Sequence, residues 1–96
     1  MDLDEAFGKN KPFVFELAKQ YGASNVRVFG SFARGDANKD SDIDLLVEME
    51  PGRDLLDIIG FSQDLEEKFG RKFDVLTTGG LSPYLRESIL SEARPL

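Results

Sequence analysis

The chain has 96 residues and a formal net charge of −6, from 12 basic and 18 acidic side chains, and 41% of its residues are hydrophobic. It contains no histidine and no cysteine, which excludes Ser-His-Asp triads, cysteine nucleophiles, thiolate or imidazole metal sites and disulfide bonds. We expect one small domain over residues 1–96, without stable nucleic-acid binding of its own, because such binding depends on basic groups.

The amino terminus carries no targeting or membrane signal. Residues 1–5 lack both a basic region and an apolar run, and nowhere does the chain hold the run of about 18 apolar residues that a membrane span needs. We therefore expect a soluble, cytoplasmic protein. Residues 1–10 are expected to form a loose N-terminal segment.

The first half of the chain predicts a helix followed by two strands. Pro12 near the first turn and Gly22 as a left-handed stop bound the helix, whose apolar stripe is Phe13, Val14, Leu17 and Tyr21. A short strand over 26–29 is followed by a single helical turn over 32–34. Residues 42–49 form the strongest predicted strand.

The second half predicts a helix, a strand and a last helix. Asp54 is expected to cap a helix that ends at Phe69, with a core face of Leu55, Ile58, Phe61, Leu65 and Phe69. A strand over 72–77 follows, and Ser82 caps a final helix with an apolar face of Leu85, Ile89 and Ala93. Strands that alternate with helices predict an α/β layer structure.

A glycine pair raises the question of phosphate binding. Gly30 and Gly35 match the start of a P-loop, but Asp36-Ala37 stands where a lysine and a hydroxyl residue are required, so that interpretation fails. Gly30 still permits a sharp turn after which free N–H groups and the Ser31 hydroxyl can face an anion. An ordinary strand turn is the other interpretation, and the glycine and serine alone favour it.

Two aspartates stand on one face of the strongest strand. Asp42 and Asp44 are two residues apart, so their carboxylates project together while Ile43 points to the opposite face. At about 4 Å such charges repel by on the order of 4 kcal/mol at an effective dielectric constant near 20. Mg²⁺ would remove this repulsion. The alternative is a solvated strand face, although aspartate is depleted in strands.

Asp74 is a third candidate, because it interrupts an otherwise apolar strand. If its strand neighbours that of Asp42 and Asp44, three carboxylates converge. Three acidic ligands can hold two metal ions for an in-line phosphoryl or nucleotidyl displacement. An ordinary outward-facing aspartate is about equally compatible with the sequence.

Together these motifs resemble a known family. Gly30-Ser31, ten residues and Asp42-Ile43-Asp44 match the nucleotidyltransferase signature of the DNA polymerase β superfamily. The wider likeness, over residues 12–96, is to the minimal nucleotidyltransferases, often called MNT. This resemblance implies a nucleotidyltransferase fold, with a small three- to four-stranded mixed sheet flanked by helices.

The resemblance also implies roles for the carboxylates. Asp42 and Asp44 would hold Mg²⁺ bound to the nucleotide phosphates. Asp74 would complete a second metal site and orient or deprotonate the acceptor hydroxyl, so two ions are expected.

For nucleotide binding, the resemblance implies that Gly30 and Ser31 contact the phosphates. ATP is the expected substrate from the habit of the family, since no residue selects the base. Arg34 lies in the Ala-Arg-Gly stretch of the family, where a phosphate contact and a structural salt bridge are both open.

The family further implies a partner, because we expect no acceptor-binding domain in a chain of this length. In MNT systems of the type VII-like toxin–antitoxin class, the partner is an all-helical HEPN toxin, and the MNT protein places AMP on a toxin tyrosine. The alternative is a non-catalytic antitoxin that masks the toxin, and a third possibility is a transferase for a small molecule or an RNA end. Leu56 and Ile59, which lie off the core stripe, hint at a partner surface, although isolated exposed apolar residues are normal.

Overall fold

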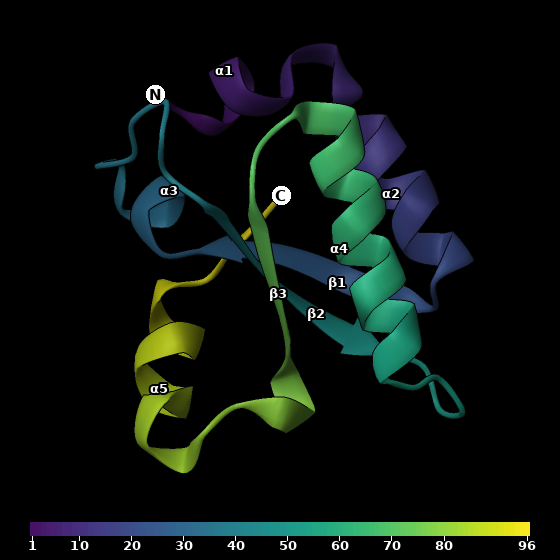
Figure 1. Cartoon of the computed structure of the whole chain (residues 1–96). Helices are drawn as coiled ribbons and strands as arrows, with labels where there is room; N and C mark the ends of the chain where they lie inside the picture. Colours follow the sequence, from purple (N-terminus) through teal and green to yellow (C-terminus); the bar gives the residue numbers. More distant parts are fainter.

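A four-stranded mixed sheet with the order β3-β2-β1-β4 organises the computed structural model, which describes residues 1–96 (Figure 1). β1 runs antiparallel to β2 and β4, whereas β3 runs parallel to β2. The predicted α/β class with a small mixed sheet flanked by helices is confirmed. None of the helices combines the length and the apolar character that crossing a membrane requires. In chain order the elements are α1 (Leu3–Phe7), η1 (Gly8–Asn10), α2 (Lys11–Gln20), β1 (Ala23–Phe29), α3 (Ser31–Arg34), β2 (Ile43–Met49), α4 (Leu55–Phe69), β3 (Phe73–Thr77), η2 (Thr78–Gly80), α5 (Pro83–Glu92) and β4 (Arg94–Pro95).

The main hydrophobic core lies between the sheet and the neighbouring helices α2 and α4 (Figure 1). Alternate residues of β2 and the inner faces of both helices supply its centre: Ile43, Leu45, Val47, Val14, Leu17, Phe61 and Leu65. Burial of an aliphatic or aromatic side chain of this size contributes about 1.5–3 kcal/mol. This layer is therefore the main source of the stability of the domain.

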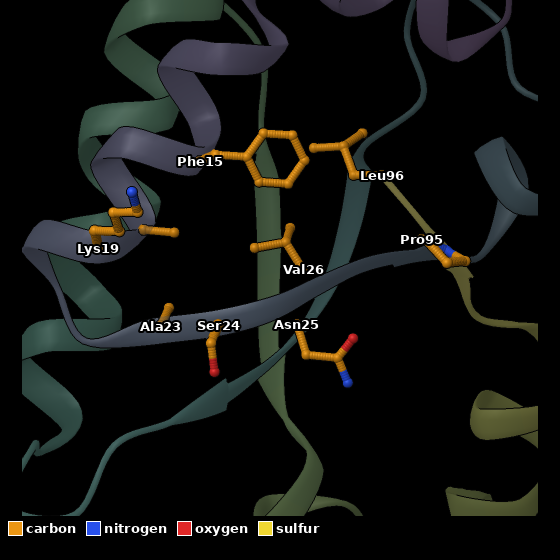
Figure 2. A pocket seen from close by; sticks show the side chains of 9 residues that line it. Phe15, Lys19, Ala23, Ser24, Asn25, Val26, Pro95 and Leu96 are labelled. Carbon is orange, nitrogen blue, oxygen red and sulfur yellow. The ribbon is translucent and has the colours of Figure 1, made fainter.

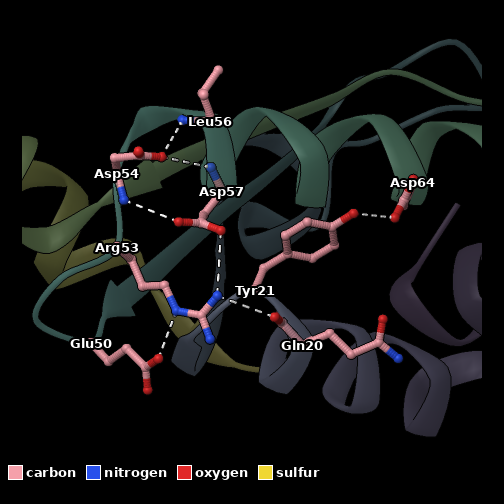
Figure 3. A network of polar contacts seen from close by, with 8 residues as sticks. All are labelled: Gln20, Tyr21, Glu50, Arg53, Asp54, Leu56, Asp57 and Asp64. Carbon is pink, nitrogen blue, oxygen red and sulfur yellow. Dashed lines mark hydrogen bonds and ion pairs between the residues drawn. The ribbon is translucent and has the colours of Figure 1, made fainter.

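Helix α4 begins and ends where its sequence predicts. The Asp54 side chain accepts hydrogen bonds from the backbone N–H groups of Leu56 and Asp57, and the Asp57 side chain accepts one from the Asp54 backbone (Figure 3). Gly70 ends the helix in the left-handed conformation, with φ 65°. Capping interactions of this kind stabilise a helix by about 1 kcal/mol.

Polar contacts tie the end of α2 to α4 (Figure 3). The Tyr21 hydroxyl donates a hydrogen bond to Asp64 at 2.5 Å, and the Tyr21 ring lies where a side chain on Gly60 would stand. Arg53, just before α4, reaches back to the backbone carbonyl of Gln20 at 3.4 Å. The absence of a side chain at Gly60 therefore allows the aromatic ring to pack closely against the helix.

The N-terminal segment differs from the expected loose conformation. Asp2 caps α1, and Phe7 is buried to 1% exposure. The Phe7 ring packs edge-on against Phe69, with 5.1 Å between ring centroids, and lies next to Phe73. The first ten residues could not reveal this, because the partners of Phe7 lie more than sixty residues further along the chain.

Two of the predicted core faces are wrong in part. Leu55 is 66% exposed although it was expected in the core of α4, and Leu85 in α5 is 56% exposed. No residue of α5 is buried, and this helix lies apart from α2 and α4 (Figure 1). Helical periodicity locates an apolar face, but only the tertiary arrangement decides whether another element covers it.

Strand β1 is longer than predicted. It begins at Ala23 instead of Val26, because Ala23 pairs with Met49 of β2. An irregularity in the register follows, where Asn25 adopts a positive φ of 49°. Turn-favouring residues there masked the strand in the sequence.

Candidate active site

The register of the sheet brings two of the predicted carboxylates to one face. Asp44 lies opposite Phe29 of β1 and beside Asp74 of β3. Paired residues on neighbouring strands share a face, so Asp44 and Asp74 point away from the side on which Ile43 is buried. The condition for convergence, that the strand of Asp74 neighbours the strand of Asp44, is therefore met. Asp42 stands one residue before β2 and is half-buried.

Asp44 lies close to two other carboxylates, those of Asp74 and Asp42. Burial, the charge of Asp74, a hydrogen bond with Asp74 and the charge of Asp42 together raise the pKa of Asp44 from 3.8 to about 6, with Arg34 acting in the opposite direction. A cation bound between Asp44 and Asp74 would be stabilised by both carboxylates and would remove their mutual repulsion.

The donor set fits Mg²⁺, an ion that binds one or two protein carboxylates and completes its shell with water and phosphate oxygens. Asp44 and Asp74 meet this requirement as a pair. No group of three acidic side chains is arranged to bind one ion together. The expected convergence of Asp42, Asp44 and Asp74 is thus present as an electrostatic cluster but not as a shared coordination geometry.

Gly30 brings the backbone against this cluster. Its φ of 75° and ψ of −152° lie in a region that only glycine adopts without strain. A Cβ at this position would overlap the carboxylate of Asp44. Ser31 follows as the first, half-buried residue of α3. The turn that carries the Gly-Ser motif therefore adjoins the acidic pair.

Glu92, at the end of α5, contacts two donor groups of the Gly30 turn, the Gly30 N–H and the Arg34 guanidinium. The Gly30 N–H donates a hydrogen bond to Glu92 Oε1 at 2.5 Å, and Arg34 Nη1 lies 3.3 Å from the same oxygen. Arg34 also pairs with Asp36 at 3.3 Å. The open question about Arg34 is answered in part, since it forms structural salt bridges. The sequence contained no signal for Glu92, which reaches the site only through the return of the chain after α5.

Arg27 is a second residue that the sequence analysis did not single out. It pairs with Leu46, one row of the sheet away from Asp44 and on the same face. Its Nη2 donates to Thr78 Oγ1 at 3.2 Å, but its Nε is buried without a hydrogen-bond partner. The available signal was a single cationic residue inside the apolar strand of residues 26–29.

An apolar groove lies elsewhere on the molecule. It has a volume of about 350 Å³ and runs between α2 and the start of β1, where Phe15, Lys19, Val26 and Leu96 line it (Figure 2). No acidic side chain contributes to its wall. This groove therefore does not offer the carboxylates that the candidate chemistry requires.

Comparisons with known sequences point to one family. A family profile described as nucleotidyltransferase domain matches residues 13–96. Protein adenylyltransferase MntA of Thermococcus cleftensis is 35% identical over 77 residues, which cover 80% of this chain and 78% of that protein. A Methanocaldococcus jannaschii protein assigned as a protein adenylyltransferase is 39% identical over 80 residues, which cover 83% of this chain and 86% of that protein.

Comparisons with solved structures agree. A structure assigned as a minimal nucleotidyltransferase superposes with a TM-score of 0.85 and 48% identity, covering 100% of this chain and 97% of that one. A crystal structure of a toxin–antitoxin with AMP-PNP superposes with a TM-score of 0.76 over 90% of this chain and 71% of that one. At 19% identity, the second likeness is one of fold alone.

Proposed function

This chain belongs to the nucleotidyltransferase domain family, and we propose that it is a Mg²⁺-dependent protein adenylyltransferase of the minimal type. It transfers AMP from ATP to a hydroxyl group of a partner toxin and thereby acts as an antitoxin. The observation that carries the proposal is the adjacency of Asp44 and Asp74 next to the backbone of Gly30. The relatives described as protein adenylyltransferases support the choice of reaction.

The Gly30 turn would hold the nucleotide phosphates. Backbone N–H groups and guanidinium groups are strong donors to phosphate oxygens. The N–H of Gly30, the hydroxyl of Ser31 and the side chain of Arg34 supply such donors from one turn. Arg27, which has no carboxylate partner, offers a further positive charge on the same face.

The three aspartates would bind two Mg²⁺ ions, which when bound supply charge neutralisation of the triphosphate and activation of the attacking hydroxyl. In the transfer, the acceptor oxygen forms a bond to the α-phosphorus while the bond from that phosphorus to the bridging oxygen breaks, releasing pyrophosphate. Asp74, exposed on the edge strand β3, would orient the acceptor hydroxyl and accept its proton. Asp42 and Asp44 would hold the ion on the phosphates.

The partner and the cellular location complete the proposal. We propose an all-helical HEPN-family toxin with a tyrosine acceptor, as the MNT resemblance implies. The 35% identical relative named MntA supports a toxin partner, because a solved toxin–antitoxin complex contains a protein of that name. The chain would act in the cytoplasm, where ATP is available. A net charge of −6 disfavours stable nucleic-acid binding by the chain alone.

The test is a transfer assay read by intact mass. The purified chain is incubated with Mg²⁺, each nucleoside triphosphate in turn and the product of the adjacent gene as the candidate toxin. The expected result is a mass gain of one or more AMP units on the partner with ATP, and no gain with Asp44→Asn or Asp42→Asn. Asp40→Asn, an exposed aspartate in the preceding loop, is the matched control and should retain transfer.

Two outcomes would contradict the proposal. One is the absence of any nucleotide on the partner with every triphosphate. The other is an equal mass gain with wild type and Asp44→Asn, since the reaction would then not depend on the acidic pair. A mass gain on the partner that also disappears with Asp40→Asn would show that the assay reports folding instead of site chemistry.

A masking antitoxin is the alternative, and one observation favours it. The start of α4 exposes Leu55, Leu56 and Ile59, the first two at 66% and 74%, and neighbouring apolar side chains of this kind fit a protein partner. Neutralisation of the toxin in cells by Asp44→Asn would support masking. Loss of neutralisation by this variant, while it still binds the toxin, would support catalysis.

A further inference from the structure

Two of the three donor groups assigned to the Gly30 turn, the Gly30 N–H and the Arg34 guanidinium, already contact a carboxylate of the chain itself. Glu92 Oε1 accepts the hydrogen bond from the Gly30 N–H at 2.5 Å and lies 3.3 Å from Arg34 Nη1, while Glu92 Oε2 lies 3.4 Å from the same nitrogen. The Glu92 side chain is 26% exposed, compared with 52% for Arg34. The Glu92 carboxylate therefore contacts both the Gly30 N–H and the Arg34 guanidinium, and it is the less exposed member of the pair with Arg34.

The strand register explains why Glu92 arrives there. In the antiparallel pairing of β4 with β1, Arg94 lies opposite Val28 and Pro95 lies opposite Arg27. Continuing this register by two residues places Glu92 level with Gly30. Because α5 ends at Glu92, the side chain turns into the site at the point where the helix stops.

A carboxylate and a phosphate group compete for the same donors, since both are anions with oxygen acceptors. Glu92 also lies near the acidic cluster, because its partner Arg34 is close enough to Asp44 to lower the pKa of that carboxyl. We propose that Glu92 is an intramolecular competitor of the nucleotide: in the free chain it occupies the phosphate position, and nucleotide binding requires its displacement. This inference rests on the proposed function, because it assigns the Gly30 turn to nucleotide phosphates.

Displacement of Glu92 is feasible because the segment that carries it, α5 and β4, contributes no buried residue to the core. No residue of α5 is buried, and β4 consists of two residues at the edge of the sheet. Elements with few buried contacts open at low free energy. The apparent nucleotide affinity of the chain is then its intrinsic affinity multiplied by the fraction of molecules in which Glu92 has left the site.

The test measures nucleotide binding by the full chain without a partner, using calorimetry with ATP and Mg²⁺ and, separately, inorganic tripolyphosphate. Glu92→Gln removes the competing charge and should bind both probes about three- to tenfold more tightly than wild type, which corresponds to the net free energy of one ordinary hydrogen bond. Glu92→Asp keeps the charge but shortens the reach, and should show the same direction of change.

The matched control is Glu87→Gln, which makes the same change of net charge on an exposed position of α5. Its affinity should equal that of wild type, which separates displacement from a general loss of negative charge. Thermal unfolding of each variant establishes that it is folded, and Glu92→Asp carries the test if Glu92→Gln does not fold. The backbone amide resonance of Gly30 supplies a second readout, and it should shift in Glu92→Gln before any probe is added.

The outcomes separate the two proposals. ATP binding by wild type with equal or weaker binding by both Glu92 variants would overturn the competition and leave the proposed function intact. Equal tightening in Glu87→Gln would also overturn it. Absence of ATP binding in wild type and in all variants would overturn the proposed function, and the competition with it.

Discussion

Phe61 and Leu65 of α4 are fully buried against the sheet, whereas next to the Gly30 turn Asp44 is half-buried and α5 buries no residue. The first region is an apolar layer closed by two helices. The second collects like charges, a positive-φ glycine and a lightly held C-terminal segment. This contrast indicates that burial of the apolar layer offsets the free-energy cost of the like charges and of the positive-φ glycine at the candidate site.

The largest effect is expected in the apolar layer. Phe61→Ala should lower the free energy of unfolding by about 3–5 kcal/mol, because it removes a fully buried aromatic ring and leaves a cavity. Urea unfolding measures the change. Leu56→Ala on the same helix, at 74% exposure, is the control and should stay within about 0.5 kcal/mol of wild type. Equal losses in both variants would contradict the statement that the buried face of α4 is the source of stability.

At the turn, Gly30→Ala should reduce stability by about 1–3 kcal/mol and abolish transfer of AMP. Its φ of 75° is strained for alanine, and its Cβ would displace the Asp44 carboxylate. Gly52→Ala is the control, because Gly52 has a φ of 90° but open space where a Cβ would stand. Thermal unfolding and the transfer assay together measure the result. Loss of transfer in the control would show that the backbone strain, and not the contact with Asp44, matters.

Within the acidic cluster, Asp44→Asn should raise the stability of the metal-free chain by about 1 kcal/mol while it abolishes transfer. The substitution removes a partly buried charge that faces Asp74 and Asp42. Addition of Mg²⁺ should stabilise wild type but not this variant. Thermal unfolding with and without Mg²⁺ checks both statements, with Asp40→Asn as the control. A variant that is less stable than wild type without metal would contradict the account of the cluster.

The smallest effect concerns the contact between α2 and α4. Tyr21→Phe removes the hydroxyl that donates to Asp64 at 2.5 Å and should lower the free energy of unfolding by less than any of the changes above, with no change in transfer. Chemical denaturation measures the loss. Tyr84→Phe, at 95% exposure, makes the same chemical change without a buried contact and should leave stability unchanged. A loss of transfer in Tyr21→Phe would link the two regions.

Much of the fold follows from local signals. The caps at Asp54 and Ser82 and the end at Gly70 are formed as expected, because each depends on residues only a few positions away. The residue pattern also locates the strands over residues 42–49 and 72–77, whereas their pairing stayed a condition that the sequence left open and the structure meets. Local pattern is least informative where a partner is distant, as for Phe7, Leu55 and the segment after α5.

The order of the amino acids alone establishes the chemical inventory of this protein: carboxylates and a Gly-Ser turn without histidine or cysteine, in a spacing that resembles one family. Only the packed fold places Asp44 beside Asp74 and brings Glu92 to the donor groups of the Gly30 turn. It also shows that a side chain at position 30 would overlap the Asp44 carboxylate. Helix caps and turns depend on neighbours in the chain, so they can be recognised locally. Strand register and charge proximity, by contrast, join residues that only the packed sheet brings together.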